Sequence, residues 1–269
     1  MTYKLLTLDI DGTLTNSRKQ ITPATLAAIG RAEQAGVGIV LATGRPTYGV
    51  APIAERLNMQ EKGGYVLSFN GGKITEWRSK KTIYESDLPR DVLPFLYKKA
   101  KDNHVAIMTY HNEYVMSETT DDPYVQIEVN LNHMKGKKIR SFLTDTDFPL
   151  PKCIITGAPP TIERLEDELN GKLSDRLSIY RSEPFFLEIM PKGIDKAGSL
   201  SILLKKLGIG REEMIACGDG YNDIPMIRFA GVGVAMANAQ REVVQVADYI
   251  TSSNDEDGVA KVIDKFIKS

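Results

Sequence analysis

Four short segments of the chain combine carboxyl, hydroxyl or amino side chains with glycine. They are Asp9-Ile10-Asp11-Gly12, Thr43-Gly44-Arg45, Gly193-Ile194-Asp195-Lys196 and Gly218-Asp219-Gly220-Tyr221-Asn222-Asp223. In the first segment, Asp9 and Asp11 stand two residues apart at the end of an apolar run, so both carboxylates face the same side of an extended chain. One of them could act as a nucleophile and its neighbour as a general acid and base. Taken alone, the pair is equally compatible with an Asx turn that closes a strand.

Two further segments suit the binding of an anion. Thr43-Gly44 places a hydroxyl and an unhindered backbone amide where a strand passes into a helix, a position at which phosphate is often bound. Lys196 lies in the first turn of a predicted helix, where a cation is unfavourable unless an anion sits beside it. For each segment alone, an ordinary helix cap or a surface lysine is the simpler explanation.

The last segment indicates a metal site. Asp219 and Asp223 follow residues 214–217, an apolar run in which carboxylates are costly to bury without a cation. Hard oxygen ligands of this kind suit Mg²⁺. A glycine-rich loop that binds no metal is the alternative. In the first segment, a calcium-binding EF-hand is excluded, because glycine stands at the fourth loop position instead of the sixth.

The elements that must position these residues alternate along the chain. Short apolar runs predict strands at 5–10, 37–42, 65–69, 214–217, 232–235 and 249–251. Helical periods predict helices at 22–35, 46–57, 195–207, 222–230, 241–247 and 258–267. Such alternation indicates βαβ units, so the predicted fold class is α/β with a Rossmann-like parallel-sheet core. Sites of open α/β sheets form outside the carboxyl ends of the strands, where the four segments are expected.

The middle of the chain has a different character. Nine of the thirteen prolines and all three histidines lie between residues 84 and 191. From residue 73 to residue 189, the patterns predict strands at 73–77, 82–85, 106–110, 113–116, 177–182 and 185–189 and helices at 86–104 and 161–169. We therefore predict a core of residues 1–83 and 190–269, with an α+β domain of residues 84–189 inserted into it.

The composition limits the class of protein and its partners. The 269 residues carry 34 Lys and Arg against 35 Asp and Glu, a formal net charge of −1, which attracts neither nucleic acid nor an anionic membrane. The chain shows two cysteines, no signal peptide and no run of 18 apolar residues, so we expect a cytoplasmic protein. The three histidines do not form a multi-histidine metal motif.

Taken together, the four segments resemble a known family. The order D-x-D, Thr, Lys, D-x-x-x-D around the strand ends of one sheet is similar to that of the haloacid dehalogenase (HAD) superfamily of phosphohydrolases. Further likeness lies in Asn70-Gly71, in residues 182–189 and in residues 230–238. The chain looks like the Cof-type subfamily, especially its YidA-like sugar phosphatases. The position of the insert then implies a C2-type cap.

The resemblance implies a Mg²⁺-dependent phosphatase that forms an aspartyl phosphate. Asp9 would be the nucleophile, Asp11 the general acid and then the base, and Lys196 a cation that neutralises charge. The metal would be held by Asp9, Asp11 through its main-chain carbonyl, Asp219 and Asp223. Asp223 would support the metal directly or through water, or orient Lys196. The phosphate of the substrate would be bound by Ile10, Thr43, Gly44, Lys196 and Asn222.

The expected partner is a small phosphorylated metabolite, a sugar phosphate first, with flavin and pyridoxal phosphates as alternatives. The sequence does not indicate the oligomeric state. Some side chains of the insert are of types that bind sugar hydroxyls, although packing is the simpler explanation for each: Tyr110, His111, Asn112, Tyr114, Tyr124 and His133.

Two other functions share these motifs. A phosphomutase would pass the phosphate from Asp9 to a second sugar hydroxyl. A non-enzymatic, receiver-like module would use phosphorylated Asp9 as a switch. The second acid, Asp11, and the large insert argue against the receiver-like module, because a switch gains little from rapid dephosphorylation.

Overall fold

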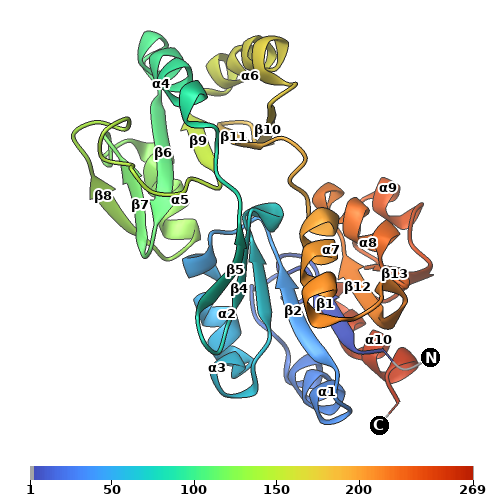
Figure 1. Ribbon diagram of the computed structural model, residues 1–269. Coiled ribbons are helices and arrows are strands. Elements are labelled where there is room, and N and C mark those ends of the chain that lie inside the picture. The colour runs from blue at the N-terminus through green and yellow to red at the C-terminus, as the bar shows by residue number, and fades with distance from the viewer. Residues whose placement is uncertain (1–2, 269) are drawn as a thin grey trace. The chain divides into compact units, whose positions relative to one another are not determined.

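The computed structural model describes residues 3–268 and divides into two compact units (Figure 1). The first unit contains the chain up to residue 44, residues 50–84 and the chain from residue 195, whereas the second contains residues 45–49 and 85–194. In Figure 1, the first unit combines the blue-to-teal and the orange-to-red parts of the chain. The domain limits predicted at 84 and 190 stay a prediction, because a division by contacts does not establish independent folding.

An eight-stranded sheet forms the middle of the first unit, in the order β14-β13-β12-β1-β2-β3-β4-β5. Its strands are β1 (Leu5–Leu8), β2 (Gly38–Ala42), β3 (Tyr65–Ser68), β4 (Lys73–Glu76), β5 (Lys81–Glu85), β12 (Met214–Gly218), β13 (Val232–Ala235) and β14 (Tyr249–Ile250). Every neighbouring pair from β14 to β3 is parallel, and β4 runs antiparallel to β3. The strand β1 is central, between β2 and β12, so its carboxyl end lies in the middle of the sheet edge.

Helices cover both faces of this sheet. They are α1 (Pro23–Gln34), α2 (Ala51–Arg56), α3 (Met59–Lys62), α7 (Lys196–Leu207), α8 (Ile224–Phe229), α9 (Arg241–Val244) and α10 (Gly258–Phe266). Successive side chains of a strand point to opposite faces. Leu6 and Leu8 accordingly share a core with Ile29 of α1, and Leu5 shares another with Leu203 of α7. Burial on both faces explains why these strands are continuous apolar runs.

The second unit contains a six-stranded sheet in the order β10-β11-β9-β6-β7-β8. Its strands are β6 (Ala106–His111), β7 (Tyr114–Ser117), β8 (Lys135–Lys138), β9 (Cys153–Thr156), β10 (Leu177–Glu183) and β11 (Phe186–Pro191). Its helices are α4 (Leu93–Asp102), α5 (Pro123–Leu131) and α6 (Pro159–Leu173). Leu96 of α4 and Leu165 of α6 pack with Ile107 and Ile155 of the sheet in one apolar core.

The predicted fold class is confirmed: a parallel α/β core and a separate α+β sheet. The sequence patterns did not predict α3, α5, β8 and β9. The strand β8 (Lys135–Lys138) is an exposed edge strand whose backbone pairs with β7 while its lysines stay in solvent. Within residues 3–268, no helix has the length and apolar character required to cross a membrane.

Candidate active site

A buried lysine bridges two aspartates at the carboxyl ends of β1 and β12. Lys196 Nζ donates to Asp9 Oδ1 at 2.7 Å and to Asp223 Oδ1 at 2.5 Å, and the Lys196 side chain has 0% exposure. Lys196 is the first residue of α7, and Asp195 caps this helix by accepting the Gly198 N–H at 2.7 Å. The position is unfavourable for a cation on the helix alone. The two carboxylates that face the lysine explain why it is found there.

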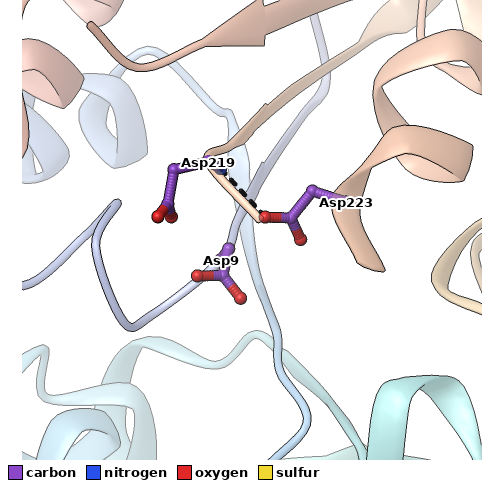
Figure 2. A group of neighbouring side chains, drawn as sticks. All are labelled: Asp9, Asp219 and Asp223. Atoms are coloured by element: carbon purple, nitrogen blue, oxygen red, sulfur yellow. Dashed lines mark hydrogen bonds between the residues drawn. The ribbon is translucent and has the colours of Figure 1, made fainter. Parts of the chain in front are cut away.

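Three carboxylates converge at this point (Figure 2). One oxygen from each of Asp9, Asp219 and Asp223 lies within 4.8 Å of the others. Asp223 Oδ2 accepts the backbone N–H groups of Asp219 and Gly220, both at 2.9 Å, and Thr13 Oγ1 donates to Asp219 Oδ1 at 2.7 Å. Carboxylate oxygens gathered in this way are the ligands that Mg²⁺ prefers in proteins.

The turn after Asp9 requires glycine. Gly12 has a φ of +86°, and a Cβ at this position would lie 2.3 Å from Asp219 Oδ2. Asn238 Nδ2 donates to the Gly12 carbonyl at 2.9 Å, which ties the turn to the segment after β13. Only a residue without a side chain can therefore pass so close to the Asp219 carboxylate.

The Asp11 carboxylate is not one of the converging groups within the described part of the chain. Its Oδ1 instead pairs with Lys19 Nζ at 2.8 Å, and the lysine side chain is 62% exposed. An exposed ion pair contributes little free energy, so this one costs little to break. The sequence patterns did not indicate Lys19. Its own backbone is left-handed (φ +60°), a conformation that leaves no periodic pattern in the sequence.

Three of the residues predicted to bind phosphate, Thr43, Gly44 and Asn222, lie next to Asn70. Asn222 Nδ2 donates to Asn70 Oδ1 at 2.9 Å, and the Asn70 backbone N–H donates to the Thr43 carbonyl at 2.9 Å. A Cβ on Gly44 would lie 3.2 Å from Asn70 Oδ1. The side chain of Ile10 lies in the hydrophobic core, so only its main chain can face a phosphate. The sequence indicated Asn70-Gly71 as a turn and as part of the family likeness, but not as part of the site.

Burial and charge shift the pKa values of the central groups. Burial raises the pKa of Asp9 well above its usual range, and Asp223 adds to this while Lys196 opposes it. Burial also raises the pKa of Asp219 to about 6, against the hydrogen bond from Thr13. Burial lowers the pKa of Lys196, but the carboxylates of Asp223 and Asp9 outweigh burial and hold it above its usual value. Acids that resist ionisation beside one fixed cation indicate that a second cation would be favourable.

The raised pKa of Asp219 predicts how the metal-free protein responds to pH. An aspartate titrates near pH 3.9 in an unfolded chain and, at this position, near 6 in the folded one. Between these values the folded state binds more protons, so the contribution is present at low pH and is lost as pH rises through about 6. In EDTA, we expect Asp219→Asn to remove about 1 to 2 kcal/mol of this pH dependence, after allowance for partial exposure. Urea unfolding of both proteins at about pH 4.5 and pH 7 measures it, and identical pH dependence contradicts the assignment.

A model of the haloacid dehalogenase-like hydrolase family matches residues 6–263. The match covers both units and every residue predicted for the site. The chain belongs to this family. The predictions that it is an enzyme and that it has the HAD fold are thereby confirmed.

Several proteins similar to this HAD-like hydrolase have names or structures. The Bacillus subtilis 5-amino-6-(5-phospho-D-ribitylamino)uracil phosphatase YcsE is 33% identical over 265 residues, which cover 97% of this chain and 94% of YcsE. A haloacid dehalogenase-like hydrolase from Bacteroides thetaiotaomicron has a structure with a TM-score of 0.94 and 51% identity, covering 98% of this chain and 99% of that one. The structure of BT4131, described as a HAD subclass IIB sugar phosphatase, has a TM-score of 0.83 and 27% identity and covers 98% of both chains.

The second unit of this HAD-like hydrolase holds a buried polar network of its own. Lys152 Nζ pairs with Glu188 Oε1 at 3.2 Å. The Tyr110 hydroxyl and Asn132 Nδ2 both donate to Glu128 Oε1, at 2.6 and 2.7 Å. Burial, followed by the charge of Glu128, raises the pKa of Tyr110 well above its usual value, so its hydroxyl stays a donor. Such fixed donors and acceptors were not predicted, apart from Tyr110, because they come from parts of the chain that are far apart in the sequence.

The other polar side chains predicted for the insert of this HAD-like hydrolase have packing or turn roles. The His111 ring lies 4.1 Å from the Phe148 ring, and the Tyr124 ring is stacked on Phe185 at 5.3 Å. Asn112 and His133 have left-handed backbones, with φ of +51° and +52°, and the ring of Tyr114 lies beside two lysines of β8.

Proposed function

We propose that this chain is a Mg²⁺-dependent phosphatase that hydrolyses small phosphorylated metabolites, sugar phosphates above all, through an aspartyl phosphate. The observation that carries the proposal is the fully buried Lys196, which contacts Asp9 and Asp223 while Asp219 lies within 4.8 Å of both. A fixed cation among carboxylates suits a reaction that brings a further anion to the same point. Phosphoryl transfer is such a reaction, because its catalysis consists mainly of positioning and charge stabilisation.

The proposed reaction has two steps. An Asp9 carboxylate oxygen attacks phosphorus and the bond to the leaving oxygen breaks, while Asp11 gives its proton to that oxygen. Asp11, now a carboxylate, then takes a proton from water, whose oxygen attacks the phosphorus. The bond to Asp9 breaks, which releases phosphate and restores both residues. The ion pair with Lys19 favours the carboxylate form of Asp11, but it is exposed and weak, so Asp11 can leave it at little cost to take up the proton.

The phosphate is proposed to contact residues from all four segments. The Thr43 hydroxyl, the Gly44 and Ile10 backbone amides and the Asn222 side chain supply hydrogen-bond donors. Lys196 supplies charge. Two short contacts support the grouping of Thr43-Gly44 with Asn222, since Asn70 bonds to Asn222 and to the backbone of Thr43.

The residues present fit a magnesium ion by the chemistry of their donor atoms. Asp9, Asp219, Asp223 and the Asp11 main-chain carbonyl would hold it. When bound, Mg²⁺ would neutralise the carboxylates and the phosphoryl oxygens. Asp223 already accepts hydrogen bonds on both of its oxygens, one set from Lys196 and one from two backbone amides. We therefore assign Asp223 chiefly to the orientation of Lys196 and of the loop that carries Asp219.

The proposed substrate class rests on the similar proteins. BT4131 is described as a sugar phosphatase, and the name of YcsE contains a phosphorylated ribityl chain. Both names denote phosphate esters that carry several hydroxyl groups. We propose that residues 84–189 form a C2-type cap that selects the leaving group. A cytoplasmic location is part of the proposal, and it agrees with Cys153 and Cys217, which are both free and buried.

Metal removal and product analysis test the proposal. The purified chain should release inorganic phosphate from an aryl phosphate and from sugar phosphates, with one free sugar for each phosphate. EDTA should lower this rate by at least about 100-fold, and added Mg²⁺ should restore it. Full activity in EDTA contradicts the metal. Isomerised sugar phosphate without phosphate release indicates a phosphomutase, and a stable phosphorylated Asp9 without turnover indicates a receiver-like switch.

A further inference from the structure

The turn after β3 has backbone conformations that most residues avoid. The φ angle is +54° at Phe69, +53° at Asn70 and +98° at Gly71. A left-handed conformation is unfavourable for an aromatic residue and persists only where surrounding contacts hold it. One such contact comes from α7, where the Ser199 hydroxyl donates to the Gly71 carbonyl. Ser199 lies one helical turn after Lys196, so this turn is attached to the helix that supplies the buried cation.

The side chain of Asn70 joins parts of the sheet that are far apart. The strands β3 and β12 are separated by β2 and β1, a spacing of roughly 14 Å at about 4.8 Å per strand. Asn222, in the turn after β12, nevertheless donates from Nδ2 to Asn70 Oδ1 at 2.9 Å. The two turns must therefore meet beyond the ends of β1 and β2, the strands that Asp9 and Thr43 follow.

This contact fixes the orientation of the Asn222 amide. An amide nitrogen carries two N–H groups, and when one donates to Asn70 the direction of the other is set by the amide plane. Asn70 also contacts the Thr43–Gly44 segment, because its backbone N–H donates to the Thr43 carbonyl at 2.9 Å. Gly44 leaves room for this arrangement, since a Cβ there would lie 3.2 Å from Asn70 Oδ1.

We infer that Asn70 is a positioning residue for phosphate, which aligns the Asn222 amide with the Thr43–Gly44 segment. The inference rests on the proposed function, in which Asn222 contacts the phosphoryl group. The inference accounts for the unfavourable turn at residues 69–71, because this conformation lets Asn70 contact both Asn222 and Thr43. Asn70 acts through Asn222 and needs no contact with the substrate.

The test is a mutant cycle in which binding of inorganic phosphate is measured by calorimetry in the presence of Mg²⁺. Asn222→Ala should weaken binding about twentyfold in the wild-type background, as expected for loss of a hydrogen bond to a charged group. Asn70→Gly keeps the left-handed backbone but removes the acceptor, so it should weaken binding about fivefold. In the N70G background, N222A should then weaken phosphate binding about fourfold or less. In the N70D background, which retains an acceptor, N222A should weaken phosphate binding by about the same factor as in the wild type.

The matched control is Asn58→Gly, which makes the same replacement at an exposed left-handed residue (φ +55°) far from these contacts in the sequence. It should leave phosphate binding unchanged. Should N70G fail to fold in a thermal melt, Asn70→Ala removes the acceptor instead. If N222A weakens phosphate binding equally in the wild-type and N70G (or N70A) backgrounds, the inference is overturned. Because phosphate binding needs no turnover, a wild-type chain that binds phosphate in this coupled way but hydrolyses no ester would contradict the proposed function alone.

Discussion

Asp9→Asn is expected to lower the rate of phosphate release by at least about 500-fold, because a neutral amide does not attack phosphorus. Asparagine has the shape of aspartate, and its amide oxygen can still accept the hydrogen bond that Lys196 Nζ gives to Asp9 Oδ1. The loss should therefore come from chemistry and not from misfolding. Steady-state release of phosphate from an aryl phosphate measures it, with a thermal melt to show that the variant is folded.

The control for this replacement is Asp264→Asn, which changes an exposed acid that pairs with Arg31 at 2.5 Å on the surface of the same unit. It should keep the wild-type rate. Acid quenching during turnover should trap a phosphoryl group on the wild-type chain and none on D9N. Activity of D9N within tenfold of the wild type, or a trapped phosphoryl group in D9N, would remove Asp9 as the nucleophile.

Lys196→Met should have the second largest effect, on both activity and stability. Methionine fills a similar volume but leaves the Asp9 and Asp223 carboxylates without the cation that each contacts. Removal of one partner from a buried ion pair costs about 3 kcal/mol or more, so the metal-free variant should unfold at lower urea concentration. We also expect kcat/KM to fall by about 1000-fold, because the charge that faces the phosphoryl group is lost.

The pH of the stability measurement matters for this variant. The pKa of Lys196 is raised in the folded chain, so its contribution is complete at neutral pH and is lost only as pH rises through the raised value. Urea unfolding near pH 7 in EDTA therefore measures the full effect. Lys205→Met, an exposed lysine on the same helix, is the control and should change neither quantity. A K196M protein as stable and active as the control would show that the buried lysine has no role in either.

The strands around the site were predictable because of how they are buried. The strands β1, β2 and β12 lie between two layers of helices, so they appear in the sequence as continuous apolar runs. Residues that follow such strands share one edge of the sheet when the strands are parallel. This is why the sequence alone predicts that Asp9, Thr43 and Asp219 lie together, with Lys196 beside them.

The contacts made by turns were not predictable in this way. Lys19 reaches Asp11 and Asn70 reaches Asn222 through left-handed residues, whose conformation leaves no periodic pattern in the sequence. The strand β8 was missed for another reason, since Lys135-Gly-Lys-Lys138 contains no apolar residue and is held by its backbone alone. Apolar periodicity reports burial, so it does not register an element whose side chains all stay in water.

The central place of β1 has a consequence for synthesis of the chain. Leu5 pairs with Gly38 on one side and with Met214 on the other, so one edge of β1 stays open until about 200 further residues have been made. At about 5 to 20 residues per second, this wait lasts roughly 10 to 40 s on the ribosome. An apolar strand with an open edge invites pairing with other chains, which makes this interval the vulnerable one. The segment that ends it also brings Lys196, Asp219 and Asp223, so the nascent enzyme acquires its charged centre only as its sheet is completed.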